Sequence, residues 1–231
     1  MATKAKPRDP VQISKVIYNA NVFNLKNWDK HLMNADNLPQ TVTRLFSTLR
    51  ERQIDHLLVG GVALLQYIEG RNTEDIDLII ASASLKKIPE IEIADQNNDF
   101  ARGTFDELRI DILLADNPLF KKVQQHYATT RQFAEQIIPC ATVEGLLLLK
   151  LYALPSLYRK GDFTRVFLYE NDITTLIYNY QPSIKPLLNE LSAHLNSSDL
   201  REVTNILSEI QQRISRLRNA GQSRQEPPET Q

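Results

Sequence analysis

Apolar and polar positions along the first 140 residues have the spacing of short strands and helices. Residues 38–53 predict a helix with Pro39 near its start and one apolar face, made of Val42, Leu45, Phe46 and Leu49. Strand-like apolar runs occur at 55–60, 75–80, 90–94, 100–105, 108–115 and 134–141. Further helices are expected at 62–70, where Gly70 would end the helix, and at 117–127, with a helical turn at 82–88. Two residues, 106 and 107, separate two of the strands and predict a hairpin.

From residue 142 onward the apolar spacing is helical. Thr142 is expected to cap a helix that ends at Pro155, and Asp162 to cap a second helix, with a third at 185–195. The last helix has a coiled-coil-like seam at Leu200, Val203, Leu207, Ile210, Ile214 and Leu217. Because three heptads are only marginally stable alone, packing of this seam within the chain is favoured over a dimer or partner contact through residues 200–217.

These patterns predict an α+β protein in four parts. Residues 1–35 form an N-terminal segment, in which 11–20 fit either a strand or the start of a helix and 25–33 fit a short amphipathic helix. Residues 36–140 are expected to form the α+β core, and residues 141–220 a helical domain. Residues 221–231 are polar and proline-rich, a composition typical of a disordered tail.

Composition narrows the class of protein. The chain has 231 residues, 42% of them hydrophobic, which suffices for one large domain or two small ones. A formal net charge of −1 argues against a protein that coats nucleic acid through bulk charge. The small net charge does not exclude a local basic patch, which could be formed by Lys121, Lys122, Arg131, Arg159, Lys160 and Arg165.

The chain has a single cysteine and no apolar run long enough to cross a bilayer. It is therefore expected to be cytoplasmic and not membrane-bound, and Cys140 is expected to be a packed thiol at a strand end.

Two carboxylates interrupt the apolar strand pattern at 75–80. Asp75 and Asp77 are separated by one residue, so strand periodicity places both on the same face. Burying two carboxylates side by side is costly unless a cation lies between them. Oxygen ligands of this kind suit Mg²⁺, with Mn²⁺ as the alternative.

A third carboxylate, Asp111, lies in the strand pattern at 108–115 with apolar residues on both sides. It is equally costly without a cation, and one metal site shared with Asp75 and Asp77 explains all three acids. The competing interpretation is a structural ion pair with Arg109, which shares its strand face, or with Arg102.

The glycine pair Gly60–Gly61 ends the strand at 55–60 and opens the next helix. Backbone amides at a helix start can bind phosphate, and glycine allows a ligand to approach closely. A phosphate cradle beside a metal site fits in-line transfer of a nucleotidyl or phosphoryl group.

The stretch VGGVALLQYIEGRNTEDIDLII, residues 59–80, resembles the G-G/S…D-x-D signature of the DNA polymerase β-like nucleotidyltransferase superfamily. It is most similar to the AbiEii/AbiGii-type nucleotidyltransferases, toxins of bacterial type IV toxin–antitoxin and phage-abortive systems. Their R-x-[ST]-x-D-[IV]-D stretch corresponds to residues 71–77, and their later lysine and aspartate correspond to Lys150 and Asp172. The resemblance covers about residues 40–180.

The resemblance implies a nucleotidyltransferase fold, a mixed twisted sheet flanked by helices and followed by a helical part, with NTP-dependent transferase activity. Nucleotide-binding residues would be Gly60, Gly61, Arg71, Thr73 and Lys150. Catalytic residues would be Asp75, Asp77, Asp111, Lys150 and Asp172. The first three aspartates would bind the metal, Asp111 would help to activate the acceptor hydroxyl, and Asp172 would orient Lys150 or the base.

The implied acceptor is a tRNA, since modification of tRNA ends by family relatives blocks translation, and a cognate antitoxin is the implied partner. Alternatives are an enzyme that AMPylates a protein in an antitoxin-like role, one that modifies a small-molecule hydroxyl such as that of an aminoglycoside, and a catalytically silent nucleotide-binding or scaffold protein. Taken by itself, a lysine in an apolar helix such as Lys150 more commonly snorkels to water. Likewise, the alternative role of Arg71, taken by itself, is that of a cation at the C-terminal end of a helix.

Overall fold

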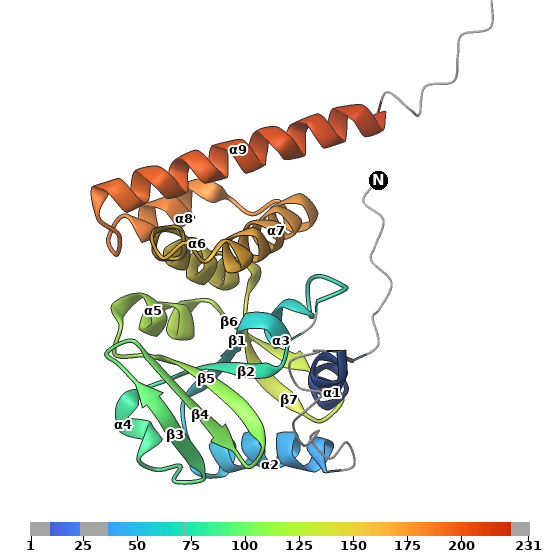
Figure 1. Cartoon of the computed structure of the whole chain (residues 1–231), viewed down its shortest axis with the longest axis vertical. Coiled ribbons are helices and arrows are strands. Elements are labelled where there is room, and N and C mark those ends of the chain that lie inside the picture. The colour runs from blue at the N-terminus through green and yellow to red at the C-terminus, as the bar shows by residue number, and fades with distance from the viewer. Residues whose placement is uncertain (1–9, 24–36, 72, 223–231) are drawn as a thin grey trace, which may run out of the picture. The chain divides into compact units, whose positions relative to one another are not determined.

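The computed structural model describes residues 10–23, 37–71 and 73–222 (Figure 1). The chain divides into two compact units, Met1–Thr142 and Val143–Gln231, which are described separately. The expected amphipathic helix at 25–33 lies outside the described residues, as does 223–231 of the expected tail. None of the helices in the described ranges combines the length and apolar character needed to cross a membrane.

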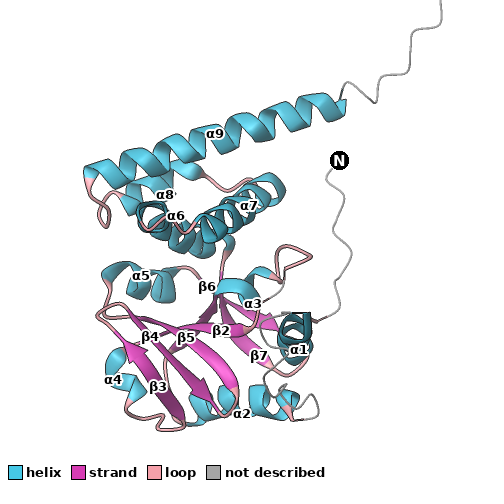
Figure 2. Ribbon diagram, viewed as in Figure 1, coloured by secondary structure: helices cyan, strands magenta, loops and turns pink. Residues whose placement is uncertain are grey.

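The described part of the first unit contains one mixed sheet of seven strands in the order β3-β4-β5-β2-β1-β7-β6 (Figure 2). Pairs β2/β5 and β1/β7 are parallel, and the other neighbours are antiparallel. The strands are β1 (His56–Val59), β2 (Asp75–Ile80), β3 (Ile91–Gln96), β4 (Phe100–Phe105), β5 (Leu108–Leu114), β6 (Ala128–Gln132) and β7 (Ile137–Ala141). All six expected strands and the hairpin between β4 and β5 are confirmed. The edge strand β6 was not expected, because its polar, largely exposed sequence has no apolar alternation.

Helices cover both faces of this sheet, with α2 (Leu38–Glu51) and α5 (Pro118–His126) on opposite sides of it (Figure 2). The predicted apolar face of α2 is buried, and the Arg44 guanidinium of α2 lies 5.0 Å from the centroid of the Phe105 ring. On the other face, the ring centroids of Phe100 and Phe120, the latter from α5, are 5.5 Å apart. Phe100 and Phe105 are five residues apart on β4, so they point to opposite faces.

Residues 11–20 fall mostly in a helix, α1 (Ile13–Phe23), which resolves the ambiguity of their pattern. Its buried residues Ile13, Ile17 and Ala20 have helical spacing. The Glu135 carboxylate accepts hydrogen bonds from the backbone N–H groups of Ile13 and Ser14 at 3.1 and 2.9 Å. A carboxylate at this position satisfies free amides and complements the helix dipole, so it stabilises the start of α1.

The helix predicted at 62–70 is shorter and begins earlier, as α3 (Gly60–Leu64). The chain then turns, with the backbone N–H groups of Tyr67 and Ile68 each donating to Leu64 O at 2.8 Å. Tyr67 is buried, and its hydroxyl donates to Ala141 O at 2.8 Å. Turn-like hydrogen bonds therefore continue to Ile68, but the regular helix ends earlier than the apolar spacing predicted, where Tyr67 is buried beside β7. The short helix α4 (Ser82–Leu85) confirms the helical turn expected there.

The second unit is helical, with α6 (Val143–Arg159), α7 (Phe163–Tyr180), α8 (Ile184–Leu191) and α9 (Ser197–Gln222). The expected end of α6 at Pro155 is wrong, because the helix continues past this proline, which is buried with Leu151 and Leu154. Tertiary packing thus outweighs the loss of one backbone hydrogen bond. The Asp162 side chain caps α7 as expected, accepting from the Arg165 N–H at 3.2 Å.

The apolar seam of α9 is used within the second unit. Packing of α9 against α6, α7 and α8 buries the four seam residues Val203, Leu207, Ile210 and Ile214. The seam residue Leu217, near the end of the helix, is 57% exposed. The favoured interpretation, packing of the seam within the chain, is therefore confirmed for these four residues.

We expect Cys140 to be inert in the folded protein. It is buried in β7, and burial raises the pKa of its thiol to about 12. Because the thiolate is the reactive form, native protein at pH 8 should react with an aromatic disulfide reagent on the order of 100-fold more slowly than protein unfolded in guanidinium. Absorbance of the released thiolate measures both rates. Equal rates in the two states would contradict the buried position.

Candidate active site

The central strand β2 places Asp75 and Asp77 on one face of the sheet. Both aspartates are half-buried, whereas Ile76 and Leu78, which point to the opposite face, are fully buried. The apolar residues of β2 are held in the core, and a slip of one residue would move both carboxylates into that core. The strand's packing therefore fixes the face on which the carboxylates lie.

Asp111 lies on the same face as this pair. In the parallel ladder of β2 and β5, Asp111 is aligned with Asp77 and Arg109 with Asp75. Aligned residues on neighbouring strands point to the same side, so the three acids share one face, as the sequence predicted. Within the described residues, however, no three His, Cys, Asp or Glu side chains are grouped so that they could hold a metal ion. Asp75 and Asp77 offer oxygen ligands that suit a hard cation, but Asp111 does not complete a three-carboxylate site in this structure.

Asp111 is instead engaged by an arginine on the neighbouring strand β4. The distance from Arg102 Nε to Asp111 Oδ1 is 3.4 Å, and the two residues are aligned in the antiparallel ladder. Arg109, the other candidate partner, has its Nη2 atom 2.7 Å from Glu74 Oε2. The competing interpretation is thus confirmed for Arg102 and not for Arg109, and the metal interpretation of Asp111 stays a prediction.

The glycine turn after β1 fits closely against two of the predicted site residues. Gly60 has φ +62°, a left-handed conformation that favours glycine, and a Cβ there would lie 1.9 Å from Asp77 Oδ2. A Cβ on Gly61 would lie 2.6 Å from both Cβ and Oγ1 of Thr73. The Gly61 N–H donates to Asp77 Oδ2 at 3.2 Å. One amide expected to bind phosphate is thus bonded to Asp77, and a phosphate role for the two glycines stays a prediction.

Thr73 connects the glycine turn to the first aspartate of β2. Its hydroxyl donates to Asp75 Oδ1 at 2.7 Å, while its side chain packs against Gly61. The family resemblance assigns Thr73 to the nucleotide, and the structure adds that it orients Asp75. The T-x-D spacing was the available signal, because hydroxyl and carboxylate side chains two residues apart often bond locally. Arg71, half-buried, lies two positions before Thr73.

Lys150 and Asp172 form a buried ion pair within the second unit. The distance from Lys150 Nζ to Asp172 Oδ2 is 2.8 Å, and the Lys150 Nζ lies 3.9 Å from the centroid of the Tyr169 ring. Lys150 is only 6% exposed and Asp172 is fully buried, so the alternative that Lys150 snorkels to water is wrong. Their predicted roles toward a nucleotide stay predictions.

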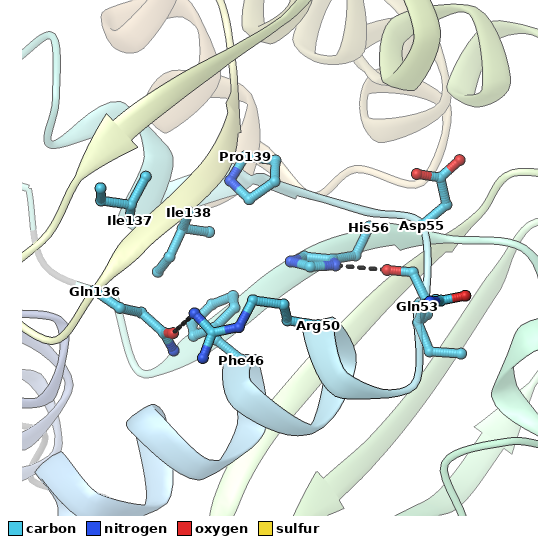
Figure 3. Close-up of a pocket in the computed structure, with 10 residues that line it drawn as sticks. Phe46, Arg50, Gln53, Asp55, His56, Gln136, Ile137, Ile138 and Pro139 are labelled. Carbon is cyan, nitrogen blue, oxygen red and sulfur yellow. Dashed lines mark hydrogen bonds between the residues drawn. The ribbon is translucent and has the colours of Figure 1, made fainter.

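A separate hollow lies at the opposite end of β1 from the glycine turn. Phe46 and Arg50 of α2, His56 and residues 136–139 line much of it (Figure 3). His56 Nδ1 lies 2.8 Å from Ile54 O, and burial lowers the pKa of His56. A neutral imidazole is therefore expected at pH 7. This hollow contains none of the residues predicted for the active site.

Comparison with known proteins supports the fold. The sequence matches no protein-family model, and no curated protein is similar to it in sequence. The chain is similar to the crystal structure of an antigenic nucleotidyltransferase-like protein from Paracoccidioides brasiliensis, with 21% sequence identity and a TM-score of 0.53 over 78% of this chain and 91% of that one. This likeness confirms the expected fold class, an α+β nucleotidyltransferase fold.

Looser similarity extends to two structures of the antibiotic-resistance factor ANT(2'')-Ia, one of them in complex with adenylyl-2''-tobramycin. They have 11% and 12% identity and TM-scores of 0.47 and 0.46, and cover 81% and 76% of this chain and 98% and 97% of their own. These TM-scores are too low to establish a shared fold.

Alanine at Gly60 should destabilise the protein and disturb the site. The strain of a left-handed alanine and the overlap with Asp77 should together cost about 2–5 kcal/mol of unfolding free energy. Gly70→Ala is the matched control: Gly70 has φ +75°, but among the described residues nothing lies within 4 Å of an added Cβ. It should therefore cost only about 1–2 kcal/mol. Urea unfolding followed by circular dichroism measures both, and equal losses would contradict the contact with Asp77.

Substitution of one member of the buried ion pair should destabilise the protein far more than substitution of both members together. Lys150→Met or Asp172→Leu alone should each lower the unfolding free energy by about 3–5 kcal/mol, because each leaves an uncompensated buried charge. The double variant Lys150→Met/Asp172→Leu should be more stable than either single variant. Urea unfolding of all four proteins gives the coupling, and single-variant losses below about 1 kcal/mol would indicate a solvated pair instead.

Proposed function

We propose that the protein is a nucleotidyltransferase that moves a nucleoside monophosphate from an NTP to a hydroxyl acceptor. The observation that carries this proposal is the glycine turn packed against Asp77, with Asp75 and Asp111 on the same face of the sheet. Carboxylates collected beside a glycine turn are costly unless they meet a cation, and the divalent metal ion that accompanies a triphosphate is such a cation. The nucleotidyltransferase-like fold supports the same activity.

The acids would divide the work between binding and proton transfer. Asp75 and Asp77 would hold Mg²⁺, with Mn²⁺ as the alternative, and each already has a donor that fixes its carboxylate: Thr73 for Asp75 and the Gly61 amide for Asp77. When bound, the ion would neutralise phosphate charge and lower the pKa of the acceptor hydroxyl. Asp111, next to Asp77, would take the hydroxyl proton as the acceptor oxygen bonds to the α-phosphorus and pyrophosphate leaves.

Several cationic and amide groups would hold the nucleotide. Gly60 and Arg71 both precede the carboxylates in sequence, and a half-buried guanidinium is well suited to bind phosphate oxygens in a bidentate way. The family resemblance assigns a phosphate contact to Lys150 and an orienting role to Asp172. The close pairing of Lys150 Nζ with Asp172 is compatible with the orienting part of that assignment.

We further propose that the acceptor is a tRNA and that the protein acts as a toxin with a cognate antitoxin. Support comes from the R-x-T-x-D-I-D stretch at 71–77 and from the match of Lys150 and Asp172 to the AbiEii/AbiGii-type pattern. Each unit separately has exposed cations that suit RNA phosphates: Lys121, Lys122 and Arg131 in the first, and Arg159, Lys160 and Arg165 in the second.

Label transfer tests the activity and its acceptor together. Each α-³²P-labelled NTP is incubated with Mg²⁺, total tRNA and cell protein, and the products are separated on denaturing gels. We expect wild type to label tRNA, and Asp75→Asn/Asp77→Asn to lower the rate by at least about 100-fold, because both metal ligands are lost. Asp116→Asn is the control, since Asp116 is an exposed aspartate that bonds the Ser82 N–H at 2.8 Å.

The outcomes separate the candidate functions. Label on a protein hydroxyl instead of RNA would identify an AMPylating enzyme. Absence of label on any acceptor with every NTP would overturn the transferase proposal and favour a silent binding protein. Circular dichroism of the double variant shows whether its loss of activity reflects lost chemistry or lost folding.

A further inference from the structure

Two arginines lie beside the acids on the same face of the sheet. Arg109 on β5 is aligned with Asp75, and Arg102 on β4 is aligned with Asp111. Because Arg109 is two residues from Asp111, the two arginines are diagonal neighbours, about 7–8 Å apart. Their side chains are 49% and 57% exposed. The acid face therefore has two solvent-accessible cations on its β5 and β4 side.

Within the described residues, each guanidinium has N–H groups beyond those in its ion pair. Arg102 uses Nε, which lies 3.4 Å from Asp111 Oδ1. Arg109 uses Nη2, which donates to Glu74 Oε2 at 2.7 Å and to Asn21 Oδ1 at 3.4 Å. A guanidinium carries five N–H donors, so both arginines can bind a phosphate and keep these partners.

The geometry of in-line transfer determines the side from which an acceptor reaches this face. The attacking oxygen and the leaving pyrophosphate lie on opposite sides of the phosphorus. In the proposed function the triphosphate is held at the glycine turn, which follows β1 and packs against Asp77. The strand order β4-β5-β2-β1 then leaves the β5 and β4 side to the acceptor, and this is the side of Arg102 and Arg109.

We propose that Arg102 and Arg109 bind phosphates of an RNA acceptor beside its reactive hydroxyl. The inference rests on the proposed function and deepens it by giving two further residues an acceptor-binding role. The three carboxylates of this face repel an anionic strand, and two cations at the point of approach offset that repulsion. A polycationic acceptor such as an aminoglycoside would instead meet two like charges there.

RNA affinity without nucleotide or divalent ions measures this contact apart from catalysis. A short fluorescein-labelled single-stranded RNA is titrated with the full chain in EDTA, and its anisotropy is followed at several salt concentrations. Arg102→Gln and Arg109→Gln should each weaken binding about five-fold at about 0.1 M salt, and lower the slope of log affinity against log salt by about 0.7, the effect of one phosphate contact. Arg109→Lys keeps the charge and should stay within about two-fold of wild type.

Arg44→Gln is the matched control. The Arg44 side chain is 58% exposed and ion-paired with Asp106, but it lies against Phe105 on the α2 side of the sheet. Its substitution removes the same charge and should leave RNA affinity within about 1.5-fold of wild type. Glu74→Gln breaks the ion pair of Arg109 from the other side. It should tighten RNA binding about two-fold, because Arg109 then loses a competing carboxylate.

Transfer of label to tRNA adds a kinetic measurement. Arg109→Gln should raise KM for tRNA about five-fold and leave kcat within about two-fold of wild type, because a phosphate contact away from the reacting atoms is the same in the ground and transition states. An unchanged KM for tRNA would contradict an acceptor contact by Arg109.

The results distinguish failure of this inference from failure of the proposed function. Unchanged RNA affinity in Arg102→Gln or Arg109→Gln, or an equal loss in Arg44→Gln, would overturn the inference while label transfer could still stand. A loss in Glu74→Gln equal to that in Arg109→Gln would also overturn it, since the ion pair itself would then be the cause.

Two further outcomes separate the proposals. If wild type binds no RNA and labels only a protein or a small molecule, the inference fails and the transferase activity stands. If both arginine variants weaken RNA binding as expected, but no acceptor is labelled with any NTP, the transferase proposal fails and the RNA contact stands.

Discussion

Three carboxylates are crowded on one half-buried face of the sheet, and this crowding dictates the turns and partners around them. Each of them is held by a different donor. Asp75 accepts from a threonine hydroxyl, Asp77 from the backbone amide of Gly61, and Asp111 faces the Arg102 guanidinium. A carboxylate without such a partner would be costly at this depth. The glycine turn, the T-x-D stretch and the arginine on β4 can all be understood as means of keeping these acids together.

The antiparallel pairing of β1 and β2 makes this arrangement possible. It aligns Val59, the last residue of β1, with Asp77, so the chain must turn directly beside a carboxylate. A side chain at the turn would occupy the position of Asp77 Oδ2, which explains why Gly60 carries none. The opposite face of β2 is apolar and buried, so neither strand can shift its register without moving a carboxylate into the core.

Most of the fold and half of the site were predictable because they depend on local periodicity. The amphipathic face of α2, the strand DIDLII and the shared face of the three acids follow from spacing alone. Features set by contacts distant in sequence were not: burial of Tyr67 shortens α3, burial of Pro155 lets α6 continue, and β6 has no apolar alternation. The choice of partner for Asp111 has the same origin. Arg109, two residues away on the same strand, lies further along the face than a cross-strand neighbour, so β4 supplies the partner.

The two ion pairs among the candidate residues differ in burial, and they therefore differ in how firmly the structure holds them. Lys150 and Asp172 are buried, and separating them would cost several kcal/mol, so their geometry is fixed whatever binds. Arg102 and Asp111 are partly solvated, and a pair of this exposure contributes at most about 1 kcal/mol. The pair on the sheet face is therefore held weakly by comparison. The pair in the helical unit is suited to hold one charge in a constant position.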